Sequence, residues 1–177
     1  MKIIRAIKRY NRFIKRNPIA QRNKVRVYMR ILSWQITSAL RKKPIEVPFI
    51  SGLKLVLEKG MTGATGNYYG GLHEFNEMGL VLHLVNDGDL FIDAGSNVGV
   101  YSLLASGVKG AKSLSFEPAL NTFERLLRNV RVNHLQDKVI CHNMALGVGN
   151  ALNIQVPNSN PNNTFKCNKC GNCNHMF

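Results

Sequence analysis

One short stretch of the chain combines residue types that could bind a ligand. Asp93-Ala-Gly95-Ser-Asn97-Val-Gly99 follows three apolar residues and precedes an apolar run with helical spacing. Glycine lets the chain turn sharply and lets a ligand approach backbone N–H groups at the start of a helix. Three residues separate Gly95 from Gly99, so the stretch departs from the G-x-G-x-x-G pattern of dinucleotide sites. Asp93 would repel a pyrophosphate and suits a cationic or amino-bearing ligand.

Two further polar residues are expected at strand ends. Glu117 lies 18 residues beyond Gly99 and ends the stretch "KSLSFE", and Asn143 ends "KVICHN". In parallel sheets, ligands bind outside the carboxyl ends of the strands. A carboxylate at Glu117 can accept hydrogen bonds from both hydroxyls of a ribose, which favours a nucleoside without a 2′-phosphate. The alternatives are glycines needed only for a turn, a solvated acid at a strand end, and an asparagine that caps a loop.

The elements that must position these residues alternate along the chain. Strands are predicted at "LFID", "KSLSFE" and "KVICHN", and helices at "VYSLLAS" and "ALNTFERLLRNVRVN". This order predicts an α/β fold, in which helices cover a parallel sheet through right-handed crossovers.

The segment before the first parallel strand is predicted to form shorter elements. "IEVPFISGLKLVLEKG" alternates as two strands that turn at Ser51 and Gly52, "MTGATGNYYGG" is typical of a Gly-rich loop, and "LHEFNEMGLVLHLV" has helical spacing. With 177 residues, one principal domain is expected. The predicted organisation is a basic helical arm (1–43), an α/β domain (44–156), and an Asn- and Cys-rich tail that is expected to be disordered (157–177).

Several motifs together resemble a known family. "DAGSNVG" followed by "SFEP" and "NMALG" resembles the S-adenosyl-L-methionine-binding half of a class I methyltransferase. "TGNYYGGLHEF" before it and "FEPALNTFERLLRNVRVN" after it resemble the FkbM family, over about residues 44–156. The resemblance implies the N-terminal half of a Rossmann-like class I methyltransferase sheet, with S-adenosyl-L-methionine as the cofactor.

The resemblance also implies roles for individual residues. The methionine and ribose part of the cofactor would be lined by Asp93, Gly95, Asn97 and Gly99. Glu117 would hold the ribose hydroxyls, and Asn143 with Met144 and Ala145 would border the adenine. The implied reaction is methylation of a hydroxyl on a small molecule or glycan. The sequence identifies no catalytic base.

The resemblance ends before the implied sheet is complete. The family would add a fourth strand with an acidic residue, whereas this chain offers three parallel strands and one more extended piece, "ALNIQVP". We therefore expect a truncated family member, whose first parallel strand exposes an apolar edge and face. A cofactor-binding remnant without turnover is the alternative function, as is a protein that acts through its basic arm.

The tail contains residues that could bind a metal. Cys167, Cys170, Cys173 and His175 have C-x-x-C-x-x-C-x-H spacing, which would suit zinc. They lack the second ligand pair, a dozen or more residues away, that most zinc folds use. We therefore expect a reactive cysteine tail rather than a metal site.

The positive charge is confined to the arm. Residues 1–43 contain 14 Lys or Arg and no Asp or Glu, whereas residues 44–177 contain 10 basic and 10 acidic residues. On a predicted helix, residues 2–16 separate into an apolar side and a basic side. Pro18 is expected to end this helix, and a second basic, apolar stretch runs from about Val25 to Leu40. Such a helix suits an anionic membrane surface or acidic partner, or packs its apolar side on its own domain. Nucleic acid is not favoured, because few aromatic residues interrupt the basic ones.

Two features of the sequence bear on localisation. The chain has no apolar run of about 18 residues and no apolar core of a secretory signal, and its cysteines do not form a distributed disulfide framework. The expectation is a cytoplasmic protein, with peripheral contact to a membrane through residues 2–16 as a further expectation.

Overall fold

The N-terminal residues form three helices, of which the periodicity of residues 2–16 predicts the first. In the computed structural model, which describes residues 2–41 and 43–146, these are α1 (Lys2–Arg16), α2 (Pro18–Arg22) and α3 (Lys24–Leu40). Asn17 ends the first helix and begins the second: its side-chain oxygen accepts a hydrogen bond from the Ala20 N–H at 2.9 Å. Pro18 fits the first helical position, where no N–H is required.

A β-hairpin follows, with the turn where it was predicted. β1 (Ile45–Pro48) pairs antiparallel with β2 (Lys54–Leu57), and the short 3₁₀ turn η1 (Ile50–Gly52) joins them. Ser51 and Gly52 have φ values of 51° and 81°, which place both in the left-handed region. The alternation of the sequence buries Leu55 and Leu57 completely.

The prediction of a Gly-rich loop is wrong, because this segment forms helix α4 (Thr62–Gly70). Its glycines serve close packing. A Cβ atom on Gly66 would overlap the ring of His73, and one on Gly70 would lie 2.6 Å from Phe13 Cζ. Glycine weakens an isolated helix by about 1 kcal/mol per residue, but here it lets α4 pack closely against neighbouring segments.

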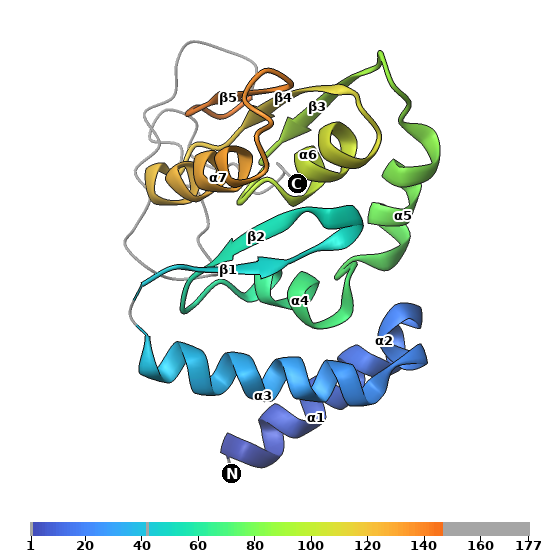
Figure 1. Ribbon diagram of the computed structural model, residues 1–177, viewed down its shortest axis with the longest axis vertical. Coiled ribbons are helices and arrows are strands. Elements are labelled where there is room, and N and C mark those ends of the chain that lie inside the picture. Colours follow the sequence, from blue (N-terminus) through green and yellow to red (C-terminus); the bar gives the residue numbers. More distant parts are fainter. Residues whose placement is uncertain (1, 42, 147–177) are drawn as a thin grey trace, which may run out of the picture.

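The remaining elements confirm the predicted α/β order. They are α5 (Phe75–Leu84), β3 (Leu90–Ala94), α6 (Val100–Leu103) with the π-helical segment η2 (Leu104–Val108), β4 (Lys112–Phe116), α7 (Leu120–Val132) and β5 (Val139–His142). The three strands pair in parallel in the order β3-β4-β5. This βαβαβ arrangement is Rossmann-like. Figure 1 shows α6 and α7 between the sheet and the β1–β2 hairpin.

The two faces of the parallel sheet differ. The face toward the helices carries buried residues such as Asp93, Ser115 and Val139. On the opposite face, Ile92, Leu114 and Ile140 are paired in register across the three strands, and Ile92 and Ile140 remain 57% and 54% exposed. Within the described part of the chain, β3 pairs with β4 alone. Within the described residues, the outer edge of β3 therefore has no paired strand, and apolar side chains on this face are exposed.

Two asparagine side chains, one in α7 and one that caps its C-terminal end, bind the free edge of β2. Asn129 is fully buried; its Oδ1 accepts from the Val56 N–H and its Nδ2 donates to the Val98 carbonyl, both at 2.7 Å. Asn133, one turn later, accepts from the Lys54 N–H at 2.7 Å and donates to the Lys54 carbonyl at 2.8 Å. These amides replace a neighbouring strand and join the hairpin to the parallel layer.

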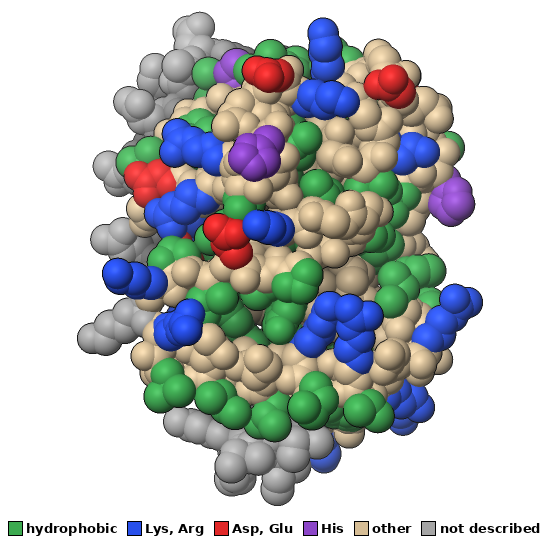
Figure 2. Space-filling model, viewed as in Figure 1, with side chains coloured by type: hydrophobic (Ala, Val, Ile, Leu, Met, Phe, Trp, Pro, Cys, Tyr) green, Lys and Arg blue, Asp and Glu red, His purple; other side chains and the backbone are tan. Residues whose placement is uncertain are grey.

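The basic segment packs on the rest of the chain. Ile14, Val27 and Trp34 are buried in the same hydrophobic cluster as Leu55 and Leu103. Figure 2 shows that α3 nevertheless presents hydrophobic side chains on its outer side, at the lower edge of the view. Among the described helices, none is both long and apolar enough to cross a membrane.

Candidate functional site at the strand ends

The turn after β3 is held by the neighbouring strand. Gly95, Asn97 and Gly99 have φ values of 80°, 50° and 82°, so all three are left-handed. The carbonyl of Phe116, the last residue of β4, accepts hydrogen bonds from the N–H groups of both Gly95 and Ser96 at 2.9 Å. The sequence places glycine or asparagine at each left-handed position, which is the chemistry that such a turn requires.

The two glycines of the turn have different roles. A Cβ atom on Gly99 would overlap the side chain of Leu126, so Gly99 is needed for close packing of α7. A Cβ atom on Gly95 would have no atom within 4 Å. Of the two glycines, only Gly95 therefore leaves space beside the strand end. Gly95 and Asn97 are both exposed to solvent.

Glu117 joins two strand ends. It follows β4 directly and is 6% exposed. Its Oε2 accepts a hydrogen bond from the Asn97 N–H at 3.0 Å, and its Oε1 accepts one from the Ala119 N–H at 2.9 Å. Burial raises the pKa of Glu117, and the nearby charge of Asp93 adds to that rise, while the two N–H donors oppose it. The predicted ribose-binding acid thus lies beside the glycine turn.

Asn143 lies at the end of the third strand, as predicted. Its Nδ2 donates to the carbonyl of Glu117 at 2.8 Å and to the carbonyl of Pro118 at 3.2 Å. Met144 and Ala145 are exposed beyond it. The ring of His142 stacks on that of Phe116 with centroids 4.9 Å apart. Asn143 therefore fixes the loop after β4 and leaves its neighbours accessible.

Asp93 is buried and is bonded to helix α6. Its Oδ2 accepts hydrogen bonds from the Ser102 N–H at 3.2 Å and the Ser102 hydroxyl at 2.5 Å. Ser102 Oγ lies 2.6 Å from Ser115 Oγ. Because the single proton of Ser102 goes to Asp93, Ser115 must be the donor in the second bond. Burial raises the pKa of Asp93, and the Ser102 bonds oppose that rise.

Two features beside the turn were missed by the sequence analysis. Ser96 Oγ has no hydrogen-bond partner in the described part of the chain. Among the buried side-chain nitrogen and oxygen atoms of the described residues, it is the only one without a partner. Tyr101, two residues after Gly99, donates its hydroxyl proton to Glu74 Oε2 at 2.7 Å. No pattern in the sequence predicts either feature, because both depend on which segments meet.

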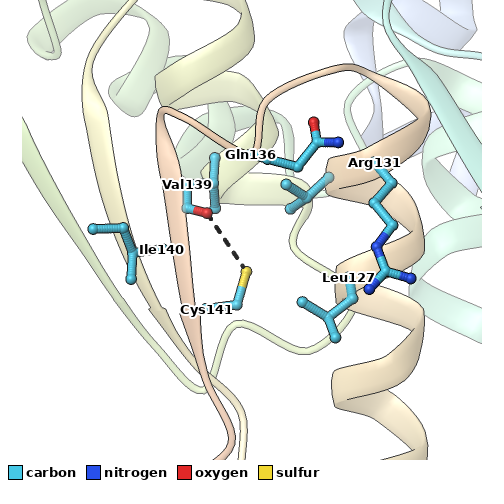
Figure 3. Close-up of a pocket in the computed structure, with 7 residues that line it drawn as sticks. Leu127, Arg131, Gln136, Val139, Ile140 and Cys141 are labelled. Atoms are coloured by element: carbon cyan, nitrogen blue, oxygen red, sulfur yellow. Dashed lines mark hydrogen bonds between the residues drawn. The ribbon is translucent and has the colours of Figure 1, made fainter.

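Two further features of the structure lie apart from the strand ends. His73 stacks on Phe13 with centroids 5.3 Å apart, so it belongs to the contact between α1 and the domain. A cavity of about 290 Å³ lies between α7 and β5 and is lined by Leu127, Val130, Arg131, Gln136, Val139, Ile140 and Cys141. Figure 3 shows that its lining side chains come from α7, β5 and the loop between them. None of the predicted site residues lines it.

The described residues include one cysteine and no candidate metal site. Cys141 is half-buried, and burial raises the pKa of its thiol to about 11, in agreement with a packing role. No group of three or more His, Cys, Asp or Glu in the described part of the chain could hold a metal ion. The predicted tail residues Cys167, Cys170, Cys173 and His175 lie outside the described residues, as does "ALNIQVP".

The electrostatics of the strand ends favour particular ligands. Asp93 and Glu117 both resist ionisation, and their charges repel each other. A bound cation would relieve that repulsion, and hydroxyl donors could use acceptor positions that Glu117 still has, since a carboxylate offers about four. A bound phosphate would add a third negative charge. The arrangement therefore suits a cationic ligand with hydroxyl groups.

The fold is similar to several solved structures. Pyrococcus horikoshii TYW2, in complex with MeSAdo, has 14% identity, and the match covers 73% of this chain and 50% of that one with a TM-score of 0.49. The Pyrococcus abyssi tRNA (uracil-54, C5)-methyltransferase, in complex with S-adenosyl-L-homocysteine, has 17% identity and coverage of 57% and 24%, with a TM-score of 0.44. A SAM-dependent methyltransferase from Thiobacillus denitrificans, in complex with S-adenosyl-L-homocysteine, has 16% identity and coverage of 38% and 27%, with a TM-score of 0.34.

The matched region spans half or less of each of these proteins. No protein-family model matches this chain, and no curated protein matches it.

Proposed function

We propose that the strand ends of β3, β4 and β5 bind S-adenosyl-L-methionine and that the chain is the cofactor-binding part of an FkbM-type methyltransferase. The observation that carries this proposal is the hydrogen bond between the Glu117 carboxylate and the Asn97 N–H. It brings an acid that can hold a ribose against a glycine turn that leaves space for a ligand.

The chemistry of the donor set fits this cofactor. S-adenosyl-L-methionine carries a sulfonium and an ammonium group and no phosphate, so its positive charge complements Asp93 and Glu117. The hydroxyl of Ser96, which lacks a partner within the described residues, offers one further polar contact beside the turn. A dinucleotide would bring its pyrophosphate to the same two acids.

The proposed roles follow the positions of the residues. Gly95 and Asn97 would face the methionine and ribose part of the cofactor, because both are exposed at the turn. Glu117 would bind the ribose hydroxyls, and Asn143 would hold the loop that borders the adenine, together with Met144 and Ala145. Asp93, bonded to α6, would act through its charge, and Gly99 would keep the turn packed on Leu126.

The proposed reaction is methylation of a hydroxyl on a small molecule or glycan. When bound, S-adenosyl-L-methionine would supply an electrophilic methyl group and a sulfur leaving group that keeps the electron pair of the broken bond. The protein's part is to hold the acceptor in line and to accept its proton. We assign no residue as that base, and we propose that further strands, from this chain or another, complete the acceptor side.

A matched pair of glycine variants tests the binding site. Gly95 and Gly88 both have positive φ, and a Cβ atom on either would have no atom within 4 Å. Gly95→Ala and Gly88→Ala should therefore cost similar stability, roughly 1 to 2 kcal/mol each. We expect calorimetric titration with S-adenosyl-L-methionine to show binding by the wild type and Gly88→Ala, and loss of affinity in Gly95→Ala by about tenfold or more.

Glu117→Gln provides the second test. The amide keeps one acceptor for the Asn97 N–H, loses the acceptor for the Ala119 N–H, and cannot accept both ribose hydroxyls, so affinity should fall. The melting temperature should also fall, and the circular dichroism spectrum must show that the variant is folded at the temperature of the titration. Glu124→Gln, on the exposed side of α7, is the control. A folded wild type that fails to bind S-adenosyl-L-methionine would contradict the proposal.

A non-catalytic binding protein is the second candidate. The open edge of β3 and the exposed Ile92 and Ile140 favour it, because the described sheet lacks neighbours that would build an acceptor pocket. Saturable cofactor binding without methyl transfer to any hydroxyl acceptor would distinguish this candidate from the enzyme.

A further inference from the structure

Helix α3 is apolar on two opposite sides. Val27, Ile31 and Trp34 are at most 7% exposed and face the core. On the other side lies a second set, spaced by three or four residues, which we call the outer stripe: Val25, Met29, Leu32, Ile36 and Leu40. These side chains are between 53% and 79% exposed. The helix therefore buries one apolar side and leaves the other in solvent.

The outer stripe is a continuous surface rather than a set of scattered residues. Successive members at positions 25, 29, 32, 36 and 40 follow one helix face for four turns, and Tyr28 extends it at 45% exposed. Figure 2 shows the hydrophobic row along α3 at the end of the molecule that lies farthest from the parallel sheet in Figure 1. Patches of this kind on a protein surface mark interaction sites.

The surroundings of the stripe are strongly cationic. Residues 1–43 contain 14 Lys or Arg and no acidic residue. Lys24, Arg26 and Arg41 on α3 and its end are exposed. In the described structure, no ion pair involves a residue before Glu46. Arg30 is half-buried and donates to the Tyr68 carbonyl at 2.7 Å. Its guanidinium lies over the Tyr68 ring, as that of Arg9 lies over the Tyr10 ring.

The second half of α1 cannot supply this surface. Ile14 is 3% exposed, Phe13 stacks on His73, and Tyr10 lies edge-on to Tyr69. The apolar side of α1 over these residues therefore packs on the domain, and the accessible apolar side belongs to α3.

We propose that the outer stripe of α3 docks on an anionic membrane surface. Aliphatic side chains can enter the boundary between headgroups and acyl chains while flanking Lys and Arg contact acidic headgroups. A nucleic acid would gain little from five aliphatic side chains. A second copy of the same surface would bring two uncompensated cationic patches together. Charge complementarity thus selects an anionic lipid surface.

Vesicle flotation with the full chain tests the proposal. The wild type should float with vesicles of phosphatidylcholine and phosphatidylserine and remain in solution with phosphatidylcholine alone. The triple variant Met29→Gln, Leu32→Gln, Ile36→Gln should lose binding by roughly tenfold or more, because three contacting side chains become polar. All three positions are exposed, so the variant should keep the wild-type circular dichroism spectrum.

A matched control separates docking from general hydrophobicity. Leu80, Leu84 and Leu120 are 57%, 65% and 60% exposed on other helices. The variant Leu80→Gln, Leu84→Gln, Leu120→Gln should float like the wild type. Lys24→Gln with Arg26→Gln should weaken binding mainly at low salt, where screening is least.

Two results would overturn the proposal. One is flotation of the outer-stripe variant to the same extent as the wild type. The other is sedimentation velocity, without lipid, that shows a wild-type dimer and a monomeric outer-stripe variant, because the stripe would then join two copies of this chain.

Discussion

At the scale of single residues, the strand ends combine buried charge with fixed hydrogen bonds. Asp93 is 8% exposed and is held by Ser102, while Glu117 holds the turn at Asn97. Both acids are also bonded within the protein, so they shape the site whether or not a ligand is bound. A ligand that carries positive charge would gain from both.

Replacement of Asp93 by asparagine should remove part of the pH dependence of stability. The pKa of Asp93 is raised in the folded protein, so the folded state binds this proton more tightly than the unfolded state does. Its contribution to stability is therefore full below the ordinary pKa of 3.8 and is lost as the pH rises through the raised value. Asp93→Asn keeps an acceptor for Ser102 and should lack this loss, which amounts to about 1.4 kcal/mol per unit of pKa shift.

Urea unfolding at a series of acidic to neutral pH values measures this effect. Asp137→Asn, at an exposed position, is the control and should follow the wild type. If the free energy of unfolding changed with pH in the same way for the wild type and Asp93→Asn, burial would not destabilise the ionised carboxylate.

At the scale of elements, side-chain amides form the hydrogen bonds that a neighbouring strand would otherwise form with the edge of β2. The edge of β2 would leave the N–H groups of Lys54 and Val56 without partners. Asn129 of α7 and Asn133, which caps the end of that helix, bind them. Glu58, just after β2, also forms ion pairs with Arg125 and Arg128 of α7. The hairpin is therefore attached to the parallel layer by polar contacts of one helix.

Asn129→Ala should destabilise the protein far more than Asn133→Ala. The first change leaves the Val56 N–H and the Val98 carbonyl without partners near a fully buried position, at a cost of about 2 to 4 kcal/mol. The second change frees groups that water can reach, so about 1 kcal/mol or less is expected. Chemical denaturation of both variants measures the difference, and equal losses would contradict the role assigned to Asn129.

At the scale of the whole molecule, the basic segment and the α/β region share one core. Trp34, the single tryptophan of the chain, is buried in the cluster that also contains Leu55, Leu103 and Leu104. Asn17, in the same segment, is 2% exposed and donates to the carbonyl of Leu72. These contacts indicate that the segment from Asn17 to Trp34 folds with the domain.

Trp34 therefore reports whether the molecule unfolds as a unit. Its fluorescence and the far-ultraviolet circular dichroism should give coincident denaturation curves. Ile31→Ala, in the shared core, should lower the free energy of unfolding by about 2 to 5 kcal/mol and move both curves together to lower denaturant. Ile36→Ala, on the exposed side, should move neither curve appreciably. A tryptophan transition at lower denaturant than the dichroism transition would mean that residues 1–43 are a separate unit.

The sequence by itself determined the order of elements and the places of the polar strand ends. Strand and helix periodicities are local properties, so β3, α6, β4, α7 and β5 were predictable. Asp93, Glu117 and Asn143 lie at the ends of these strands for the same reason. The left-handed turn was also predictable, because glycine and asparagine are the residues that adopt it at low cost.

Only the tertiary structure decided how those residues are used. The Gly-rich segment that was predicted to be a loop forms helix α4. Its glycines are needed because His73 approaches Gly66 and Phe13 approaches Gly70. Asp93 bonds to α6, and Asn129 pairs with a strand 73 positions earlier. The two apolar sides of α3 are indistinguishable in the sequence, and the packing of the whole chain buries one and exposes the other. Each of these outcomes depends on which distant segments meet, and local residue patterns carry no information about that.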